Sequence, residues 1–329
     1  MRGLELDSKL NLSLVDKTDR QPRDREVIVR VVSSGICGTD NHIIKGESRV
    51  TLPVVLGHEF GGFVQDVGKS VRSLKRGDLV VVDPNIPCHS CAYCREGKFN
   101  LCSNLTAIGV DIDGGMSDVC IVPETQAYPV ASSFDPTELP FVEPLSCVLH
   151  GLDRAAVRSG ERVLVIGAGT IGLMFVMLLK EVAAELCIDE PNPVRSGKAA
   201  TLGGRIKGAD RSEYFDVVVE CSGTVTGFAD AIARVKRGGR VLVFGVAPRK
   251  AAASVWPNEI YARELTILGS YVNPSTFSRA VEIVSNKKIS LSSFDVKAYK
   301  LNEFNDAFEA SRSGRYSKVM FSLEERGLD

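Results

Sequence analysis

With 329 residues, the chain is too long for one ordinary hydrophobic core, and we expect it to fold as two domains. Its net charge of -1 and its charged fraction of 25% exclude the broad positive field that nucleic acids and anionic membranes attract. Hydrophobic residues make up 44% of the chain, which is typical of a soluble globular protein.

The opening residues, MRGLELDSKL, lack the apolar segment of a secretory signal. The longest uncharged run, residues 163–179, is interrupted by glycines and falls short of the roughly 20 apolar residues of a membrane helix. Nine cysteines without such a signal suggest a reducing compartment, so we expect a cytoplasmic protein. In that setting, clustered cysteines bind metal more often than they form disulfides.

The first half of the chain predicts strands. From Glu26 to about Val130, short apolar runs alternate with glycine and proline, which indicates an antiparallel, barrel-like domain. The clearest of these runs are VIVRVV (27–32), FGGFVQDVG (60–68) and DLVVV (78–82).

From about Leu152 strands and helices alternate, which is the signature of a doubly wound parallel sheet. A helix over 277–286 and a mixed tail follow. The expected strands are VLVI (163–166), ELCID (185–189), FDVVVECSG (215–223), GRVLVFG (239–245) and LTILGSY (265–271). The expected helices between them are LMFVMLLKEVAA (173–184) and TGFADAIARV (226–235).

A first metal site is predicted where four cysteines follow the spacing C-x2-C-x2-C-x7-C, at Cys88, Cys91, Cys94 and Cys102. Such short spacing lets four thiolates surround one zinc ion, and a closed shell of this kind is structural. A zinc ribbon that binds nucleic acid is the rival interpretation, but Arg95 and Lys98 are the only nearby cations.

A second group of possible ligands is spread along the chain: Cys37 in GICGTDNH, His58 and Glu59 in GHE, and Glu143 in FVEPLSC. Three protein ligands and an open position make a catalytic zinc site. Spacing alone leaves other interpretations open, because a lone histidine such as His58 is more often structural and a lone Glu143 is usually a surface charge. Glu143, however, stands among apolar residues, and a buried carboxylate needs a partner or a metal.

A dinucleotide-binding loop is predicted after the strand VLVI, where Gly167, Gly169 and Gly172 form G-x-G-x-x-G and open a helix. Thr170 and Ile171 complete this loop. Asp189 and Glu190 end the next strand, where a carboxylate accepts hydrogen bonds from the ribose and favours NAD over NADP; Arg195, nearby, weakens that preference. A tight turn without a ligand is the alternative.

Together these motifs resemble the zinc-dependent medium-chain dehydrogenases, in which GICGTDNH, VLGHEFGG, the cysteine lobe, EPLSC and GAGTIG occur in this order. The glutamate of EPLSC resembles the polyol and threonine dehydrogenase branch. The resemblance implies a GroES-like β-barrel catalytic domain, residues 1–148 and 274–329, and an inserted Rossmann coenzyme-binding domain, residues 149–273.

The resemblance also implies residue roles. Cys37, His58 and Glu143 would bind a catalytic zinc, and Glu59 would be a further ligand or an acceptor for zinc-bound water. The other implied roles are second-shell support of His58 by Asp40, a proton relay through Thr39 and His42, ribose binding by Glu190, and nicotinamide packing by Val246, Ser270, Tyr271 and Val272.

The implied activity is hydride transfer between a secondary alcohol or polyol and NAD, by a homo-oligomer of two or four chains. Two departures stand out: Ile43 follows His42 where sorbitol dehydrogenases have tyrosine, and residues 205–214 leave no room for a helix that the family usually has there. The alternatives are a zinc-stabilised relative that binds dinucleotide without catalysis and a zinc-independent quinone reductase.

Overall fold

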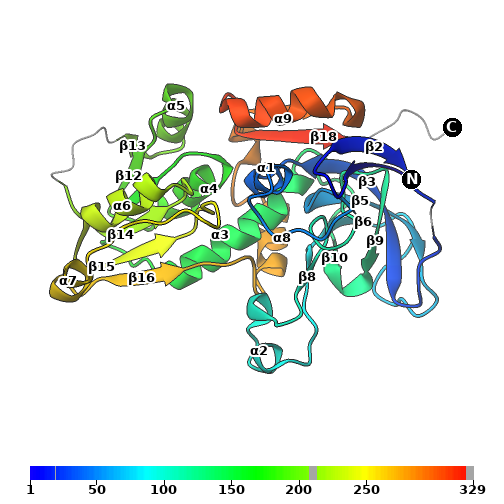
Figure 1. Ribbon diagram of the computed structural model, residues 1–329, viewed down its shortest axis with the longest axis horizontal. Helices are drawn as coiled ribbons and strands as arrows, with labels where there is room; N and C mark the ends of the chain where they lie inside the picture. The colour runs from blue at the N-terminus through cyan, green and yellow to red at the C-terminus, as the bar shows by residue number, and fades with distance from the viewer. Residues whose placement is uncertain (19, 207–212, 324–329) are drawn as a thin grey trace. The chain divides into compact units, whose positions relative to one another are not determined.

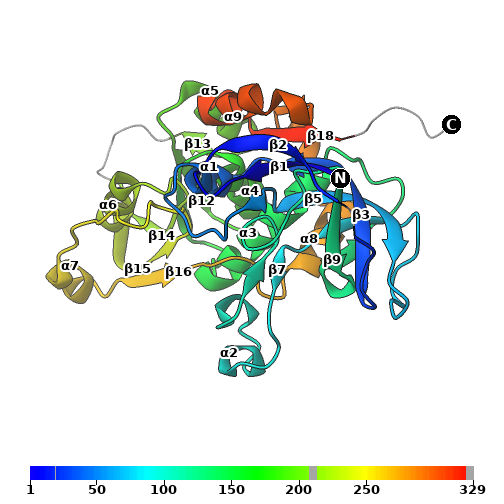
Figure 2. The same cartoon turned by 45° about the vertical axis from the view of Figure 1, so that its right-hand side comes forward.

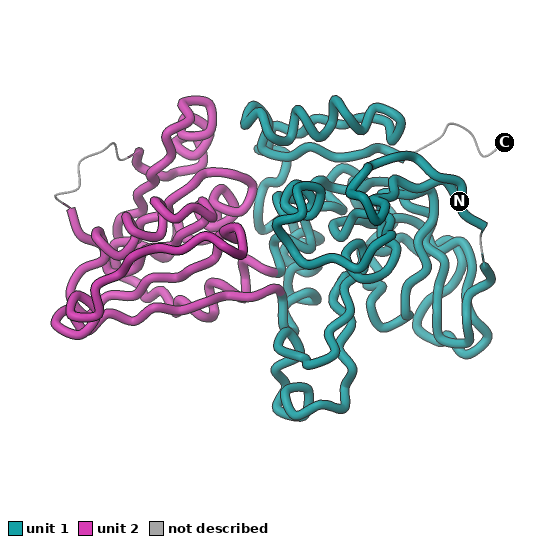
Figure 3. Tube along the Cα trace, in the orientation of Figure 1, with its two compact units in different colours: residues 1–146, 273–329 teal, residues 147–272 magenta. Residues whose placement is uncertain are grey.

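The structure is a computed structural model that describes residues 1–18, 20–206 and 213–323. The chain divides into two compact units (Figure 3). Unit 1 comprises Met1–Ser146 and Asn273–Asp329, and unit 2 comprises Cys147–Val272. Because unit 2 is inserted into unit 1, the chain leaves unit 1 after Ser146 and returns to it at Asn273.

The largest sheet of unit 1 is mostly antiparallel, in the order β10-β6-β5-β3-β18-β17, and β9 also pairs with β3 (Figure 1). Along β3, Val27, Val29 and Val31 alternate with other residues, so they share one face and pack against Phe60 and Val64. The barrel-like antiparallel prediction is thereby confirmed. The strands are β3 (Glu26–Gly35), β5 (Glu59–Val67), β6 (Leu79–Val82), β9 (Val119–Pro123), β10 (Ala127–Pro129), β17 (Val296–Tyr299) and β18 (Lys318–Ser322).

A smaller sheet of unit 1 has the order β2-β1-β4, and its Leu4 and Leu6 share a core with Ile43, Phe308 and Phe321. This core ties the N-terminal strands to the C-terminal segment. The strands of this sheet are β1 (Arg2–Leu6), β2 (Leu12–Asp16) and β4 (Val54–Val55). The helices are α1 (Gly38–Ile44), α2 (Ala92–Arg95), α3 (Val142–Ala155, which continues into unit 2), α8 (Phe277–Ser285) and α9 (Phe304–Ser313).

A lobe that carries α2 extends away from the sheets of unit 1 in both ribbon views (Figures 1 and 2). The short pair β7 (Asn85–Ile86) and β8 (Thr106–Ala107) forms its base. Short 3-10 turns complete the unit: η1 (Phe99–Leu101), η2 (Glu124–Gln126), η3 (Leu139–Phe141), η4 (Leu291–Ser293) and η5 (Leu301–Glu303). Within the described residues, every helix is too short or too polar to cross a membrane.

Unit 2 is built on a parallel sheet with the order β13-β12-β11-β14-β15-β16. This is the doubly wound order, in which the strand order reverses between β11 and β14. The strands are β11 (Arg162–Ile166), β12 (Glu185–Asp189), β13 (Arg205–Ile206), β14 (Phe215–Glu220), β15 (Val235–Val243) and β16 (Thr266–Gly269). The helices are α4 (Thr170–Leu179), α5 (Pro193–Thr201), α6 (Val225–Arg234) and α7 (Pro257–Ala262). The sequence predicted a helix over residues 173–184, whereas the observed helix, α4, ends at Leu179.

The two points where the chain leaves and re-enters unit 1 are joined by a buried polar cluster. Asn273 Nδ2 donates to Ser146 Oγ at 2.9 Å and to Asp83 Oδ1 at 3.2 Å. Asn85 Nδ2 donates to Asn273 Oδ1 at 2.6 Å, and Asn85 N donates to Asp83 Oδ1 at 3.0 Å. Burial raises the pKa of Asp83 to about 6, and the hydrogen bonds from Asn85 and Asn273 only partly oppose this.

This cluster predicts a pH-dependent stability. Asp83 has an ordinary pKa of 3.8, so folding favours its protonated form, and that stabilisation is lost as the pH rises from about 4 through about 6. As the pH rises from 4 to 7, we expect the free energy of unfolding of Asp83→Asn to increase by about 3 kcal/mol relative to that of the parent. Urea unfolding at each pH measures this difference. The exposed Asp16→Asn is the control, and a pH-independent difference for Asp83→Asn would contradict the prediction.

Candidate metal centres and dinucleotide loop

Strand pairing brings the possible ligands Cys37, His58 and Glu59 together. The end of β3 pairs with the start of β5, Gly35 opposite Glu59, so Cys37 just beyond β3 meets His58 just before β5. One potential ligand atom from each of Cys37, His58 and Glu59 lies within 4.8 Å of the others. His58 and Glu59 are buried, and Cys37 is half-buried. A thiolate, an imidazole and a carboxylate at such distances suit zinc.

Asp40 supports this group from α1. Its Oδ2 accepts from the backbone N–H of Cys37 at 2.8 Å, which caps the helix, and its Oδ1 lies 3.4 Å from His58 Nδ1. Burial disfavours a charged imidazole, but the charges of Asp40 and Cys37 outweigh it and hold the pKa of His58 well above its usual range. The surroundings of His58 therefore favour a positive charge at this position, which a proton or a metal ion can supply.

Lys318, on β18, is a member of this site that the sequence analysis missed. Its ammonium forms a fully buried ion pair with Glu59 Oε2. Gly35 lies on β3, between the strands β5 and β18 that carry Glu59 and Lys318. A side chain at Gly35 would come within 2.7 Å of both residues. Burial opposes a charged lysine, but the charges of Glu59, Cys37 and Glu143 raise its pKa above the ordinary 10.5.

Glu143 approaches from another element. It stands in the first turn of α3 and is buried, and its charge acts on Lys318. It does not belong to the group of Cys37, His58 and Glu59 whose ligand atoms lie within 4.8 Å of one another. The structure thus brings three of the four expected residues into ligand distance and leaves Glu143 in their electrostatic neighbourhood.

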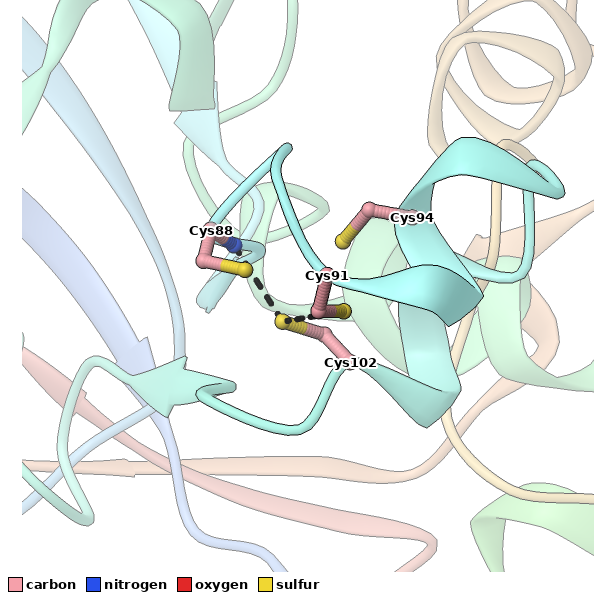
Figure 4. A group of neighbouring side chains, drawn as sticks. All are labelled: Cys88, Cys91, Cys94 and Cys102. Atoms are coloured by element: carbon pink, nitrogen blue, oxygen red, sulfur yellow. Dashed lines mark hydrogen bonds between the residues drawn. The ribbon is translucent and has the colours of Figure 1, made fainter.

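The four cysteines of the α2 lobe, predicted to bind a structural zinc, form a separate group. In Figure 4 their sulfur atoms turn toward a common centre, and all four lie within 4.8 Å of one another. Four sulfurs at about 2.3 Å from one ion in a tetrahedron are about 3.8 Å apart. The Sγ atoms of Cys91 and Cys102 are 3.9 Å apart, so the donor set fits one zinc ion.

Hydrogen bonds prepare some of these thiols for a metal. The Ser90 hydroxyl, followed by backbone amides, lowers the pKa of Cys88 to about 5. Burial, followed by the neighbouring thiols, raises the pKa of Cys94 to about 12. Because zinc binds thiolates, a cluster with one acidic thiol can begin binding near neutral pH and displace the remaining protons.

The glycine loop of unit 2 connects β11 to α4, as predicted. Gly169 is the N-cap of α4, and Thr170 and Ile171 begin the helix. A side chain at Gly172 would come within 2.0 Å of the Gly167 carbonyl oxygen, so only glycine allows this tight turn. Nothing lies within 4 Å of the position where Gly169 would carry a side chain, so the backbone is open to a ligand there. This arrangement fits a pyrophosphate at the helix N-terminus.

The two acidic residues at the end of β12, Asp189 and Glu190, form different contacts. Asp189 forms an ion pair with Arg234, which is buried on α6 and lies over the Phe215 ring. Glu190 instead turns to the loop, where its Oε2 accepts from Ala168 N at 2.8 Å. The structure therefore commits Asp189 to an internal ion pair and leaves Glu190 beside the glycine turn.

The other expected cofactor residues also lie in unit 2. Val246 and Tyr271 are exposed, while Ser270 Oγ and Arg195 Nε are buried without a hydrogen-bond partner among the described residues. The short strand of the 205–214 segment is present as β13. The expected lack of a helix concerns mainly residues 207–212, which lie outside the described residues.

The two residues expected to relay a proton, Thr39 and His42, lie on α1. Thr39 N donates to Cys37 Sγ at 3.5 Å, and His42 pairs with Glu47, which the sequence analysis did not single out. The sequence carried a local signal for Glu47, because this residue directly follows Gly46, the glycine just beyond the end of α1. Lys318 had none: a lysine at the start of a strand is ordinarily exposed, and only the pairing of β18 with β3 places it here.

Comparison with known proteins identifies the family of the chain. Residues 23–132 match the alcohol dehydrogenase GroES-like domain family, and residues 176–286 match the zinc-binding dehydrogenase family. The chain is 33% identical over 312 residues to D-arabinitol dehydrogenase 1 of Uromyces fabae, covering 89% of each chain.

Two solved structures are similar over nearly the whole chain. One, from Sinorhizobium meliloti 1021, is described as a zinc-binding dehydrogenase bound to NADP; it has a TM-score of 0.92 and 32% identity, covering 98% of each chain. The other is an alcohol dehydrogenase from Escherichia coli CFT073 complexed with NADH, with a TM-score of 0.90 and 25% identity, covering 98% of this chain and 99% of that one.

Proposed function

Because the chain belongs to the zinc-dependent medium-chain dehydrogenase family, we propose that it transfers a hydride between a secondary alcohol, such as a polyol, and NAD(P). The observation that carries this proposal is the convergence of Cys37, His58 and Glu59 within 4.8 Å, with the buried carboxylate of Glu143 in the same electrostatic neighbourhood. The alternative of a relative without catalysis is not favoured, because the named relatives are themselves dehydrogenases.

Cys37, His58 and Glu143 would hold the catalytic zinc, and the four cysteines of the α2 lobe would hold a structural one. Glu59 is the residue whose role the sequence left open. Its Oε2 is engaged by Lys318, which supports a role beside the metal rather than on it. In this arrangement Asp40, 3.4 Å from His58 Nδ1, would orient the His58 ring.

The zinc would supply Lewis acidity, which makes a substrate hydroxyl easier to deprotonate. The chain's own residues then handle the proton. Thr39 would accept it from the substrate hydroxyl and pass it to the His42 ring one turn later on α1. Lys318 would hold the Glu59 carboxylate in place, and a bound nicotinamide would supply the hydride acceptor for the alcohol carbon.

NAD is the cofactor we propose, although the two similar structures carry NADP and NADH. Glu190 supports NAD, because its carboxylate lies beside the glycine loop and would repel a 2′-phosphate. Asp189 is less suited to this role, since its carboxylate already forms an ion pair with Arg234. Arg195 on α5 is the residue that would oppose this preference.

A panel of polyols, secondary diols and L-threonine, assayed with NAD and with NADP on zinc-loaded protein, tests the proposal. We expect NADH formation with at least one polyol, faster with NAD than with NADP, and abolished in Glu143→Ala. The neighbouring Glu138→Ala is the matched control and should keep activity. Turnover with no member of the panel would contradict the proposed activity, and faster turnover with NADP would contradict the proposed cofactor.

An assembly of two or four copies is part of the proposal. It is supported by β16, which ends the order of the parallel sheet and has an exposed Ile267, and by the exposed aromatic residues Trp256 and Tyr261 nearby in the sequence. A sheet edge of this kind can pair with a second copy. Light scattering tests it, and the mass of a single chain would contradict it.

A further inference from the structure

His42 has a carboxylate partner that none of the expected roles includes. His42 Nδ1 and Glu47 Oε2 are 2.7 Å apart, and both side chains are partly exposed. The pair stands at the end of α1, in the helix that begins at Cys37. His42 therefore shares this short helix with Thr39, the other expected relay residue.

The local sequence builds this pair. Lys45 is the C-cap of α1, and Gly46 follows with a φ of +70°, a conformation that glycine adopts at little cost. Gly46 N donates to the Ile43 carbonyl at 2.9 Å, and Glu47 N donates to the His42 carbonyl at 2.8 Å. These two bonds make a Schellman motif. Glu47 is thus bound to His42 twice, through its backbone and through its side chain.

The partner determines which ring nitrogen carries the proton. An ionised carboxylate only accepts hydrogen bonds, so the His42 nitrogen that faces Glu47, Nδ1, must carry a hydrogen. In the neutral ring the other nitrogen, Nε2, then keeps its lone pair and can accept a proton. A histidine whose Nδ1 is held by a carboxylate is ready to act as a base at Nε2.

We propose that Glu47 is a positioning residue that holds His42 in the Nδ1–H tautomer, so that Nε2 receives the proton passed on by Thr39. The resulting imidazolium is stabilised by the Glu47 carboxylate and releases its proton to water. The kinetic part of this inference rests on the proposed function, whereas the tautomer does not.

The first test is nitrogen-15 NMR of the histidine rings in zinc-loaded protein at mildly alkaline pH. His42→Asn assigns the His42 signals. We expect the parent to show the Nδ1–H form and Glu47→Gln to lose it, because an amide can donate to Nδ1 and so favour the opposite tautomer. An Nε2–H form in the parent, or the same tautomer in both proteins, would overturn the proposal.

The second test is steady-state alcohol oxidation with the substrate found in the panel. We expect Glu47→Gln to lower kcat by about 10- to 100-fold with KM unchanged, and Glu47→Asp to restore part of the loss. The exposed Lys45→Gln, which changes a nearby charge without touching the ring, should leave kcat unchanged. A kcat within twofold of the parent for Glu47→Gln would refute the role. If the parent oxidises no alcohol, the proposed activity fails, and NMR alone decides the His42–Glu47 pair.

Discussion

Lys318→Met is expected to lower the free energy of unfolding of zinc-free protein by about 3 to 5 kcal/mol. Lys318 and Glu59 are both buried, and Glu59 would keep its negative charge away from water with its cation removed. The attraction of an intact buried pair only offsets its desolvation, whereas a lone buried charge bears the whole desolvation cost. The shift in the midpoint of urea unfolding measures the loss, provided that the slope of the free energy against urea concentration does not change.

The matched control is Lys297→Met on the neighbouring strand β17. Lys297 is exposed, and its ammonium lies over the Tyr299 ring, 5.5 Å from the ring centre, so its loss should cost no more than about 1 kcal/mol. The double variant Lys318→Met/Glu59→Gln should recover part of the stability, because it removes both charges. Equal losses in Lys318→Met and Lys297→Met would show that the buried pair is not a coupled unit.

The second large effect is expected from Cys37→Ala. Loss of one of the few ligands should release the catalytic zinc, so that metal analysis finds about one zinc per chain instead of about two. Alcohol oxidation should fall by roughly a thousandfold, since a Lewis-acidic metal is worth several kcal/mol of transition-state stabilisation. Inductively coupled plasma mass spectrometry and steady-state kinetics on the same sample measure both quantities.

Two other cysteines serve as controls. Cys120→Ala alters a buried thiol of unit 1 outside both metal groups, and it should keep the full zinc content and most of the activity. Cys88→Ser should lose the other zinc and destabilise the α2 lobe instead. A Cys37→Ala protein that retains two zinc ions and normal turnover would refute the assignment of the catalytic site.

Features encoded by contiguous residues were predictable. The glycine loop joins a strand to the helix that follows it, and the four cysteines lie within one short segment; the structure shows both arrangements. The parallel sheet of unit 2 was predictable because apolar strands such as β11 and β14 alternate with helical segments along the chain. Several helices, among them α5, α7 and α9, were missed; α7, for example, buries none of its residues, so it has no apolar pattern to reveal it.

The choice between Asp189 and Glu190 shows where sequence reasoning ends. Both are acidic, and both stand at the end of the same strand. Their difference comes from Arg234, on a helix far along the chain, whose buried guanidinium needs a counter-charge and finds it in Asp189. No spacing rule contains that requirement, because it arises only when α6 is folded onto the sheet.

The amino-acid sequence by itself determined the cysteine cluster of the α2 lobe and the nucleotide loop, because short-range geometry acts between neighbours along the backbone. Only the tertiary structure decided which charges neutralise one another in the interior. Glu59 and Lys318 are 259 positions apart, and they meet because β3 pairs with β5 on one side and with β18 on the other. Burial makes such a pairing obligatory, since an isolated charge in the interior is too costly to remain.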